Sequence, residues 1–222
     1  MTRRLLPVYL SLALTFALAA QPARAQDIAV AAPYRLYLAV VSRDGQPGSS
    51  PASVAAGLPS LGAFTDSVAD GAAAVRGVYV ESVLALPVVQ QPADDPVYVS
   101  AQPDTLTQFG MAAWYGVTGL LAHNYAAGRL FFEMEVGDAV TVVYGDGRVK
   151  RYQVSALLRY QALQPDSPMS DFIDLATGQQ SSAGEVFMRV YAGGEHVTFQ
   201  TCIASGSQGN WGRLFVIAEP AP

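Results

Sequence analysis

The sequence is poor in the residues that bind metals, form disulfides or contact nucleic acids. Its 222 residues include one cysteine, which excludes a disulfide framework and a thiolate zinc cluster, and two histidines, which leave little for a histidine-based metal site. Thirteen Lys and Arg residues stand against 18 Asp and Glu residues, and Lys150 is the single lysine. Because phosphate binding needs a basic excess, we expect no nucleic-acid partner, and we expect no cofactor.

Charged residues are also scarce, at 14% of the chain, whereas 51% of the residues are hydrophobic. A chain of this length and composition can bury a core, so we expect a compact domain rather than a disordered polypeptide. Any chemistry must then come from few residues.

The first 25 residues have the pattern of an export signal. Arg3 and Arg4 precede a mostly apolar stretch, residues 5–20, and Ala23-Arg24-Ala25 supplies the small-x-small pattern that signal peptidases recognise. We expect cleavage before Gln26. The apolar stretch falls short of the roughly 20 residues that span a bilayer, so an uncleaved anchor is the less favoured alternative, and membrane association stays open.

Cleavage would leave an acidic protein. Three of the 13 basic residues lie in the signal, so ten remain against 18 acidic residues, and the mature chain carries a net charge of about −8. We therefore expect an extracytoplasmic protein, secreted or associated with the cell surface. An unpaired cysteine in an oxidising compartment is a liability unless it is buried or used, which makes Cys202 the first residue to question.

The rest of the chain divides into two predicted regions. Residues 26–77 form an N-terminal extension or linker that is rich in Gly, Ala, Ser and Pro, with a short helix over 64–75. Residues 78–222 form a domain in which turn residues separate short apolar or alternating runs. These runs predict eight strands, at 78–89, 97–100, 119–123, 139–144, 148–158, 186–191, 197–203 and 213–218. We expect an all-β fold, a closed barrel of about eight strands, with helical turns only at 103–114 and 168–175.

Cys202 needs a basic or cationic neighbour to act as a nucleophile, because the thiolate is the reactive form. His196 is six residues away, and along an extended strand this separates the two side chains by about 20 Å. His123 is therefore the expected partner, placed at the end of a predicted strand, while His196 is expected to be an exposed strand residue.

An acyl-transfer site also needs a group that stabilises the developing oxyanion. The predicted strands 197–203 and 213–218 flank a polar, Gly-containing loop, and pairing them as a hairpin brings Arg213 back beside Cys202. A register slip of one residue would turn Arg213 to the other face of the sheet.

The residues around these positions resemble the sortase family. Thr198-Phe199-Gln200-Thr201-Cys202 is similar to the family's nucleophile motif, Thr-Leu-x-Thr-Cys, with Phe at the Leu position. The chain order, His123 before Cys202 before Arg213-Leu214-Phe215-Val216, is also that of sortases, whose terminal stretch is Arg-x-x-Val. The resemblance covers residues 78–218. It implies the sortase β-barrel of eight strands.

The resemblance also implies an activity and a role for each residue. A sortase is a cysteine transpeptidase that cuts a sorting signal in a secreted protein and passes the acyl group to an amine. By resemblance, Cys202 attacks the scissile carbonyl and forms a thioester, His123 protonates the leaving amine and deprotonates the incoming one, and Arg213 steadies substrate and oxyanion. The implied partners are a secreted protein or peptide with a sorting signal and an amine acceptor of the cell-wall or pilin kind.

Several further assignments follow from the resemblance. We also expect Thr201 and Asn124 to contact the substrate or the oxyanion. Many sortases have Gly before the His, whereas here the sequence is Ala122-His123-Asn124, so the sortase subclass stays open. Some sortases bind calcium near acidic residues, but we expect the acids of segment 133–138 (Glu133, Glu135 and Asp138) to be solvated surface, because nothing completes a coordination shell.

Two other classes of function remain open from the sequence. The domain could be a catalytically silent binding or structural module with the same barrel. It could also be another exported cysteine acyl-transferase, such as an L,D-transpeptidase, although the Ser-x-Gly-Cys context of that family is absent around Cys202. A thioester hydrolase is a variant of the first hypothesis, since water can resolve the thioester.

Overall fold

The computed structural model of the chain describes Leu38 and residues 57–222. The predicted export signal, its cleavage point before Gln26 and most of the extension lie outside the described residues. Within the described part, no helix has the length and apolar character needed to cross a membrane.

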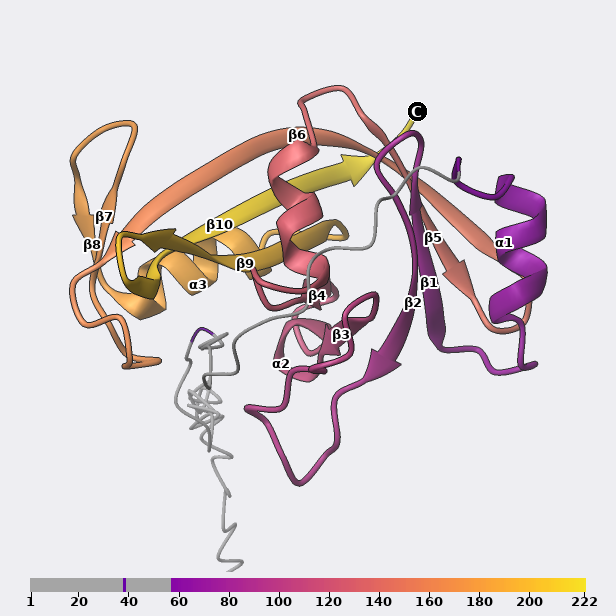
Figure 1. The fold of residues 1–222 in the computed structure, drawn as a ribbon, viewed down its shortest axis with the longest axis horizontal. Helices are drawn as coiled ribbons and strands as arrows, with labels where there is room; N and C mark the ends of the chain where they lie inside the picture. Colours follow the sequence, from indigo (N-terminus) through magenta and orange to yellow (C-terminus); the bar gives the residue numbers. More distant parts are fainter. Residues whose placement is uncertain (1–37, 39–56) are drawn as a thin grey trace, which may run out of the picture. The chain divides into compact units, whose positions relative to one another are not determined.

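Ten strands of the described domain form one sheet, and eight of them close into a ring (Figure 1). The ring order is β10-β9-β4-β3-β2-β1-β5-β6, and it closes where β6 pairs with β10. Strands β7 and β8 continue the sheet from β6 outside the ring. The expected all-β barrel of eight strands is confirmed. The strands are β1 (Val75–Val80), β2 (Leu84–Gln90), β3 (Leu106–Phe109), β4 (Thr118–Leu121), β5 (Ala139–Tyr144), β6 (Val149–Ala162), β7 (Phe172–Asp174), β8 (Gln180–Ser181), β9 (Val197–Ser205) and β10 (Gln208–Pro220).

The helices are short, as the sequence predicted. They are α1 (Leu61–Val68), α2 (Gly110–Ala113), the 3-10 helix η1 (Ala127–Glu133) and α3 (Ala183–Tyr191). The helix expected over 64–75 is therefore present but begins and ends earlier, because Ser60 caps it by accepting a hydrogen bond from the main-chain N–H of Ala63.

One predicted strand is a helix. Residues 186–191 belong to α3, which begins at a capping box: Ser182 accepts from the N–H of Glu185, and the Glu185 carboxylate accepts from the N–H of Ser182. The buried residues Val186, Phe187, Val190 and Tyr191 repeat with helical rather than alternating spacing. The strand prediction was wrong, because the capping box and the helical spacing of the apolar residues favour a helix.

Three other local predictions also differ from the structure. The run 78–89 is not one strand but the β1–β2 hairpin, which turns at Ser82 with a φ of 64°. Residues 97–100 form no strand; the helical turn expected within 103–114 is present as α2, and β3 precedes it in the same segment. The helical turn expected over 168–175 is replaced by β7, which pairs with β6.

The two faces of the barrel wall carry separate apolar clusters. The interior cluster includes Val78, Val142, Phe199 and Leu214, and Phe131 of η1 packs into it against Phe199 with ring centroids 5.2 Å apart. The outer cluster joins α3 to the wall formed by β4, β9, β10 and β6. Cys202 belongs to this outer cluster. The barrel wall is therefore buried on both faces where the candidate nucleophile lies.

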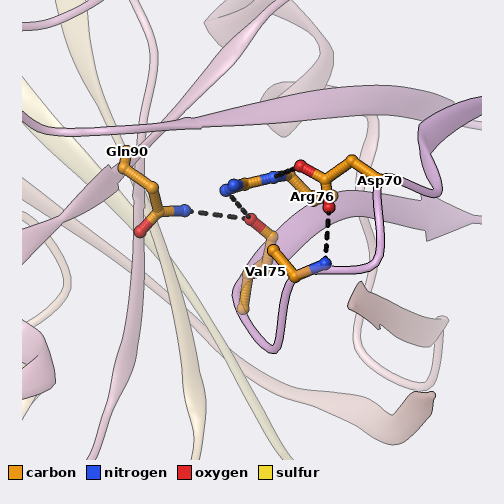
Figure 2. Close-up of polar contacts among 5 residues, drawn as sticks. Asp70, Val75, Arg76 and Gln90 are labelled. Atoms are coloured by element: carbon orange, nitrogen blue, oxygen red, sulfur yellow. Dashed lines mark hydrogen bonds and ion pairs between the residues drawn. The ribbon is translucent and has the colours of Figure 1, made fainter. Parts of the chain in front are cut away.

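A polar cluster fixes the connection between α1 and β1 (Figure 2). Arg76 and Asp70 form an ion pair with 2.7 Å between Nε and Oδ2, and the second Asp70 oxygen accepts from the N–H of Ala72. The side-chain amide of Gln90 on β2 donates to the Val75 carbonyl at 2.9 Å. The N–H groups of Asp70 and Gly71 both donate to the Gly145 carbonyl, so this connection is also tied to the β5–β6 turn.

His196 is buried between α3 and the start of β9. It is 5% exposed, and its two ring nitrogens lie 3.0 Å from the carbonyl oxygens of Gly194 and Val190. Val190 lies in the last turn of α3, where helix carbonyls have no partner within the helix. The expectation that His196 is an exposed strand residue was wrong, because its ring satisfies the end of a helix that the sequence analysis had not recognised.

We expect His196→Ala to lower the free energy of unfolding by about 1–3 kcal/mol, since it removes a buried ring and its hydrogen bonding to the carbonyl groups of Val190 and Gly194. Urea unfolding followed by circular dichroism measures this, with Gln102→Ala, an exposed position in the β2–β3 connection, as the control. An unchanged unfolding midpoint for His196→Ala would contradict this account of its burial.

Candidate active site

Cys202 and Arg213 lie directly opposite each other on the hairpin of β9 and β10. The register pairs Cys202 with Arg213, Thr201 with Leu214 and Gln200 with Phe215. Directly opposed residues of an antiparallel pair project to the same face of the sheet, with Cα atoms about 4.5–5.5 Å apart. The hairpin therefore has the register that the sequence analysis required for these two residues.

His123 follows β4, which runs parallel to β9 on its other side. The pairing ends with Leu121 opposite Gln200. Two contacts extend it: the N–H of Ala122 donates to the Gln200 carbonyl at 3.2 Å, and the Thr201 hydroxyl donates to the Ala122 carbonyl at 2.8 Å. Continuing this register by one more residue sets His123 level with Cys202.

The three residues thus lie on three neighbouring segments of chain, a row with Cys202 in the middle: His123 follows β4, Cys202 is on β9 and Arg213 is on β10. Strand side chains alternate between faces. Cys202 and Phe215 belong to the outer cluster, so Arg213, two residues from Phe215 on the same strand, projects from that outer face with Cys202. Adjacent strands are about 4.8 Å apart, which brings the side chains of Cys202 and Arg213 within contact distance.

Arg213 is a buried cation held by main-chain carbonyl groups. It is 1% exposed; Nη1 donates to the carbonyls of Asn210 and Gly212 at 2.8 and 2.9 Å, and Nη2 donates to that of Pro165 at 3.0 Å. Burial lowers the pKa of Arg213, and the electrostatic interactions of Arg213 with Cys202 and Asp166 counteract this effect. The guanidinium Nε is buried with no hydrogen-bond partner among the described residues. The row therefore contains a desolvated positive group with unused donor capacity.

The sequence analysis missed Asn210, which holds the surroundings of Arg213. The β9–β10 pairing shifts register between Gln208 and Gly212, and Asn210 lies inside this irregularity. Its side-chain amide donates to the Asp166 carboxylate at 2.7 Å and to the Pro165 carbonyl at 3.2 Å. The β6–β7 connection is thereby fixed to the hairpin. The sequence signal for Asn210 is weak, since Gly209-Asn210 suggests only a turn.

The side chains of Asn124 and Thr201 are both engaged in holding the backbone. The Asn124 amide donates to the Gly209 carbonyl at 2.8 Å, which joins the segment that follows His123 to the hairpin. Thr201 shares the interior face with Phe199, and its hydroxyl bonds to the carbonyl of Ala122. The oxyanion contact expected from Thr201 therefore remains a prediction, and it would come from the main chain of Thr201. The substrate contact expected from Asn124 also remains a prediction.

Access to Cys202 is restricted in this structure. Its exposed fraction is 0%, and it belongs to the outer apolar cluster, which also contains Phe215, Tyr160 and Leu38. Leu38 is itself 1% exposed, and its N–H donates to the carbonyl of Pro168 in the β6–β7 connection. A substrate carbonyl must therefore displace apolar contacts to reach the sulfur atom.

The other predicted positions lie apart from this row. His196 lies just before β9, bonded to the end of α3 as described above. The Asp138 carboxylate accepts from the N–H of Glu135, in the segment considered for calcium. Among the described residues, no group of three or more His, Cys, Asp or Glu side chains is arranged to hold a metal ion.

Comparison with known proteins gives similarities among solved structures only. No family model and no curated protein matches the chain. Similar structures include sortase A of Listeria monocytogenes, at 14% identity and a TM-score of 0.44 over 68% of this chain and 88% of that one. They also include sortase C1 of Streptococcus suis, at 14% identity and a TM-score of 0.43 over 72% and 78%. The sortase D5 transpeptidase of Clostridium perfringens is 14% identical, with a TM-score of 0.42 over 67% and 79%.

The backbone around His123 depends on a glycine with no room for a side chain. The N–H groups of Ala126 and Gly128 both donate to the His123 carbonyl. A Cβ atom at Gly128 would lie 2.7 Å from the Ala122 oxygen, 2.8 Å from the His123 oxygen and closer still to the Thr201 hydroxyl. Gly128 therefore permits the approach of η1 to β9 beside the site.

We expect Gly128→Ala to lower the free energy of unfolding by about 1–3 kcal/mol, because the added methyl group must push η1 away from the main chain of Ala122 and His123. Gly184→Ala is the matched control, since a Cβ there meets no atom within 4 Å and the residue lies in α3. Urea unfolding of both variants measures the difference. Equal midpoints for the two variants would show that the close approach is not a constraint.

Proposed function

We propose that this chain is an exported, sortase-like cysteine transpeptidase. What supports the proposal is the register of the hairpin, which sets Arg213 opposite Cys202, together with the position of His123 directly after β4, the strand that pairs with β9 on its other side. The row supplies a base, a thiol and a buried cation in the order that acyl transfer needs. The motif around Cys202 supports the same assignment.

The proposed reaction has two acyl-transfer steps. The Cys202 sulfur attacks the scissile carbonyl of a sorting signal, and the C–N bond breaks as His123 gives a proton to the departing amine. The acyl group is then held on sulfur as a thioester. His123 next takes a proton from an incoming amine, whose nitrogen attacks the thioester carbon and releases the Cys202 thiolate.

Arg213 would stabilise the oxyanion in both steps. Its guanidinium is already desolvated and oriented by three carbonyl groups, so little reorganisation is needed when negative charge develops beside Cys202. The unpartnered Nε supplies a further donor. Thr201 and Asn124 are secondary candidates for contacts to the substrate.

The proposal extends to partners and location. The acyl donor would be a secreted protein or peptide that carries a sorting signal, and the acceptor an amine of the cell-wall or pilin kind. Both substrates, and the predicted export signal, place the reaction outside the cytoplasm, at the cell surface or in a secreted form. No step of the reaction requires a metal or a cofactor.

The first experiment looks for the thioester directly. The purified protein is incubated with a peptide library of the Leu-Pro-x-Thr-Gly kind, and intact mass spectrometry records an acyl adduct that hydroxylamine releases. We expect the adduct on the parent protein and none on Cys202→Ala, because Cys202 is the only cysteine of the chain and carries the thiol that attacks the peptide. His123→Ala should slow adduct formation by about 10²- to 10⁴-fold.

The alternative, a silent binding module, is favoured by the complete burial of Cys202. Alkylation by iodoacetamide across pH separates the two functions, since an activated cysteine reacts well below the pH at which an ordinary thiol ionises. A thiol that reacts with the ordinary pH profile, together with no adduct from any peptide, would establish the silent module.

Arg213→Lys tests the role of the guanidinium. A lysine retains the charge but loses the planar fork in which Nη1 bonds the carbonyls of Asn210 and Gly212 while Nη2 bonds that of Pro165. We expect the rate of adduct formation to fall by about 10²- to 10³-fold. Arg151→Lys, an exposed position on β6, is the control and should react like the parent. Full activity of Arg213→Lys would show that the positive charge alone is sufficient and that the guanidinium geometry is not required.

A further inference from the structure

The His123 imidazole is stacked on an aromatic ring from its own loop. The ring centroids of His123 and Tyr125 are 4.9 Å apart, and the ring planes are inclined by 23°. This is within the range of offset stacked aromatic pairs. Tyr125 is 46% exposed, so its ring is not a core residue that happens to touch the histidine.

Hydrogen bonds around the His123–Tyr125 segment support the stacking of the two rings. Tyr125 and Ala126 lie in a turn that is closed by two hydrogen bonds onto the His123 carbonyl, from the N–H groups of Ala126 and Gly128. The intervening residue, Asn124, bonds to Gly209 of the hairpin. Hydrogen bonds therefore hold the His123 carbonyl and the Asn124 side chain, and the two rings are carried on this turn.

We propose that Tyr125 is a positioning residue that orients the His123 imidazole toward Cys202, an inference that rests on the proposed function. A stacked neighbour contacts the face of the imidazole and leaves the in-plane nitrogen atoms to their own partners. The ring can then exchange protons in both steps of the reaction without losing its orientation. An aromatic face also attracts an imidazolium more than a neutral ring, which favours the state that forms when Cys202 loses its proton.

The effect can be measured without knowing the substrate. The chain has one cysteine, so intact mass spectrometry gives the rate at which iodoacetamide alkylates Cys202. We expect Tyr125→Leu to slow alkylation by about two- to ten-fold, the factor expected for one aromatic pair. Tyr125→Phe, which keeps the ring, should restore the rate that Tyr125→Leu loses. Tyr98→Leu, a partly exposed tyrosine in the β2–β3 connection, is the matched control.

A double-mutant cycle distinguishes positioning from a general effect on the fold. In a His123→Ala background, Tyr125→Leu should cause no further loss of alkylation rate, because the residue through which Tyr125 acts is gone.

The chain has two histidines, so the proton resonances of the His123 ring are readily assigned by NMR. They should lie upfield in the parent protein and in Tyr125→Phe and move downfield in Tyr125→Leu. Tyr125→Gln provides a second non-aromatic variant for each measurement.

The outcomes separate this inference from the proposed function. If His123→Ala slows alkylation but Tyr125→Leu does not, or if Tyr125→Leu slows it equally in the parent and in the His123→Ala background, the positioning role is wrong while the proposed function stands. If His123→Ala alkylates as fast as the parent, the proposed function itself is wrong and the positioning role falls with it.

Discussion

The burial of Arg213 is the constraint on which the arrangement of the site depends. A guanidinium removed from water is costly unless its donors are satisfied, and here three of its hydrogen bonds go to main-chain carbonyl groups. Within the described residues no carboxylate lies within ion-pair distance of Arg213. Carbonyl groups stabilise the cation without neutralising it. The positive charge therefore remains available to Cys202 and to any anion that forms beside it.

Those carbonyl groups are available because the hairpin is irregular. The register shift between Gln208 and Gly212 removes main-chain groups from the β9–β10 ladder, and the Asn210 carbonyl turns to Arg213 while that of Gly209 accepts from Asn124. Register irregularities of this kind are common beside active sites. One short segment of chain thus joins the loop that carries His123, the strand that carries Arg213 and the β6–β7 connection.

The pairing of Arg213 with Cys202 was easier to predict from the sequence than the elements around it. The placement of Arg213 opposite Cys202 needed only a hairpin and its register, which are local properties of the chain. The helix α3 was missed although its capping box, Ser182 and Glu185, can be recognised in the sequence. The roles of Gly128 and Asn210 could not be predicted, because they depend on how closely two segments approach in space, and no local pattern encodes that distance.

The site also depends on closure of the barrel, because β10 is shared by two pairings. Arg213 lies opposite Cys202 on β9 and opposite Tyr160 on β6. The preceding residue, Gly212, lies so close to β6 that a Cβ atom would collide with the Tyr160 carbonyl. A side chain at that position would separate β10 from β6 at the seam where the ring closes. Because Arg213 is the next residue, the same displacement would move the guanidinium away from its carbonyl partners. The glycine that permits the barrel to close is thus also a requirement for the position of the cation beside Cys202.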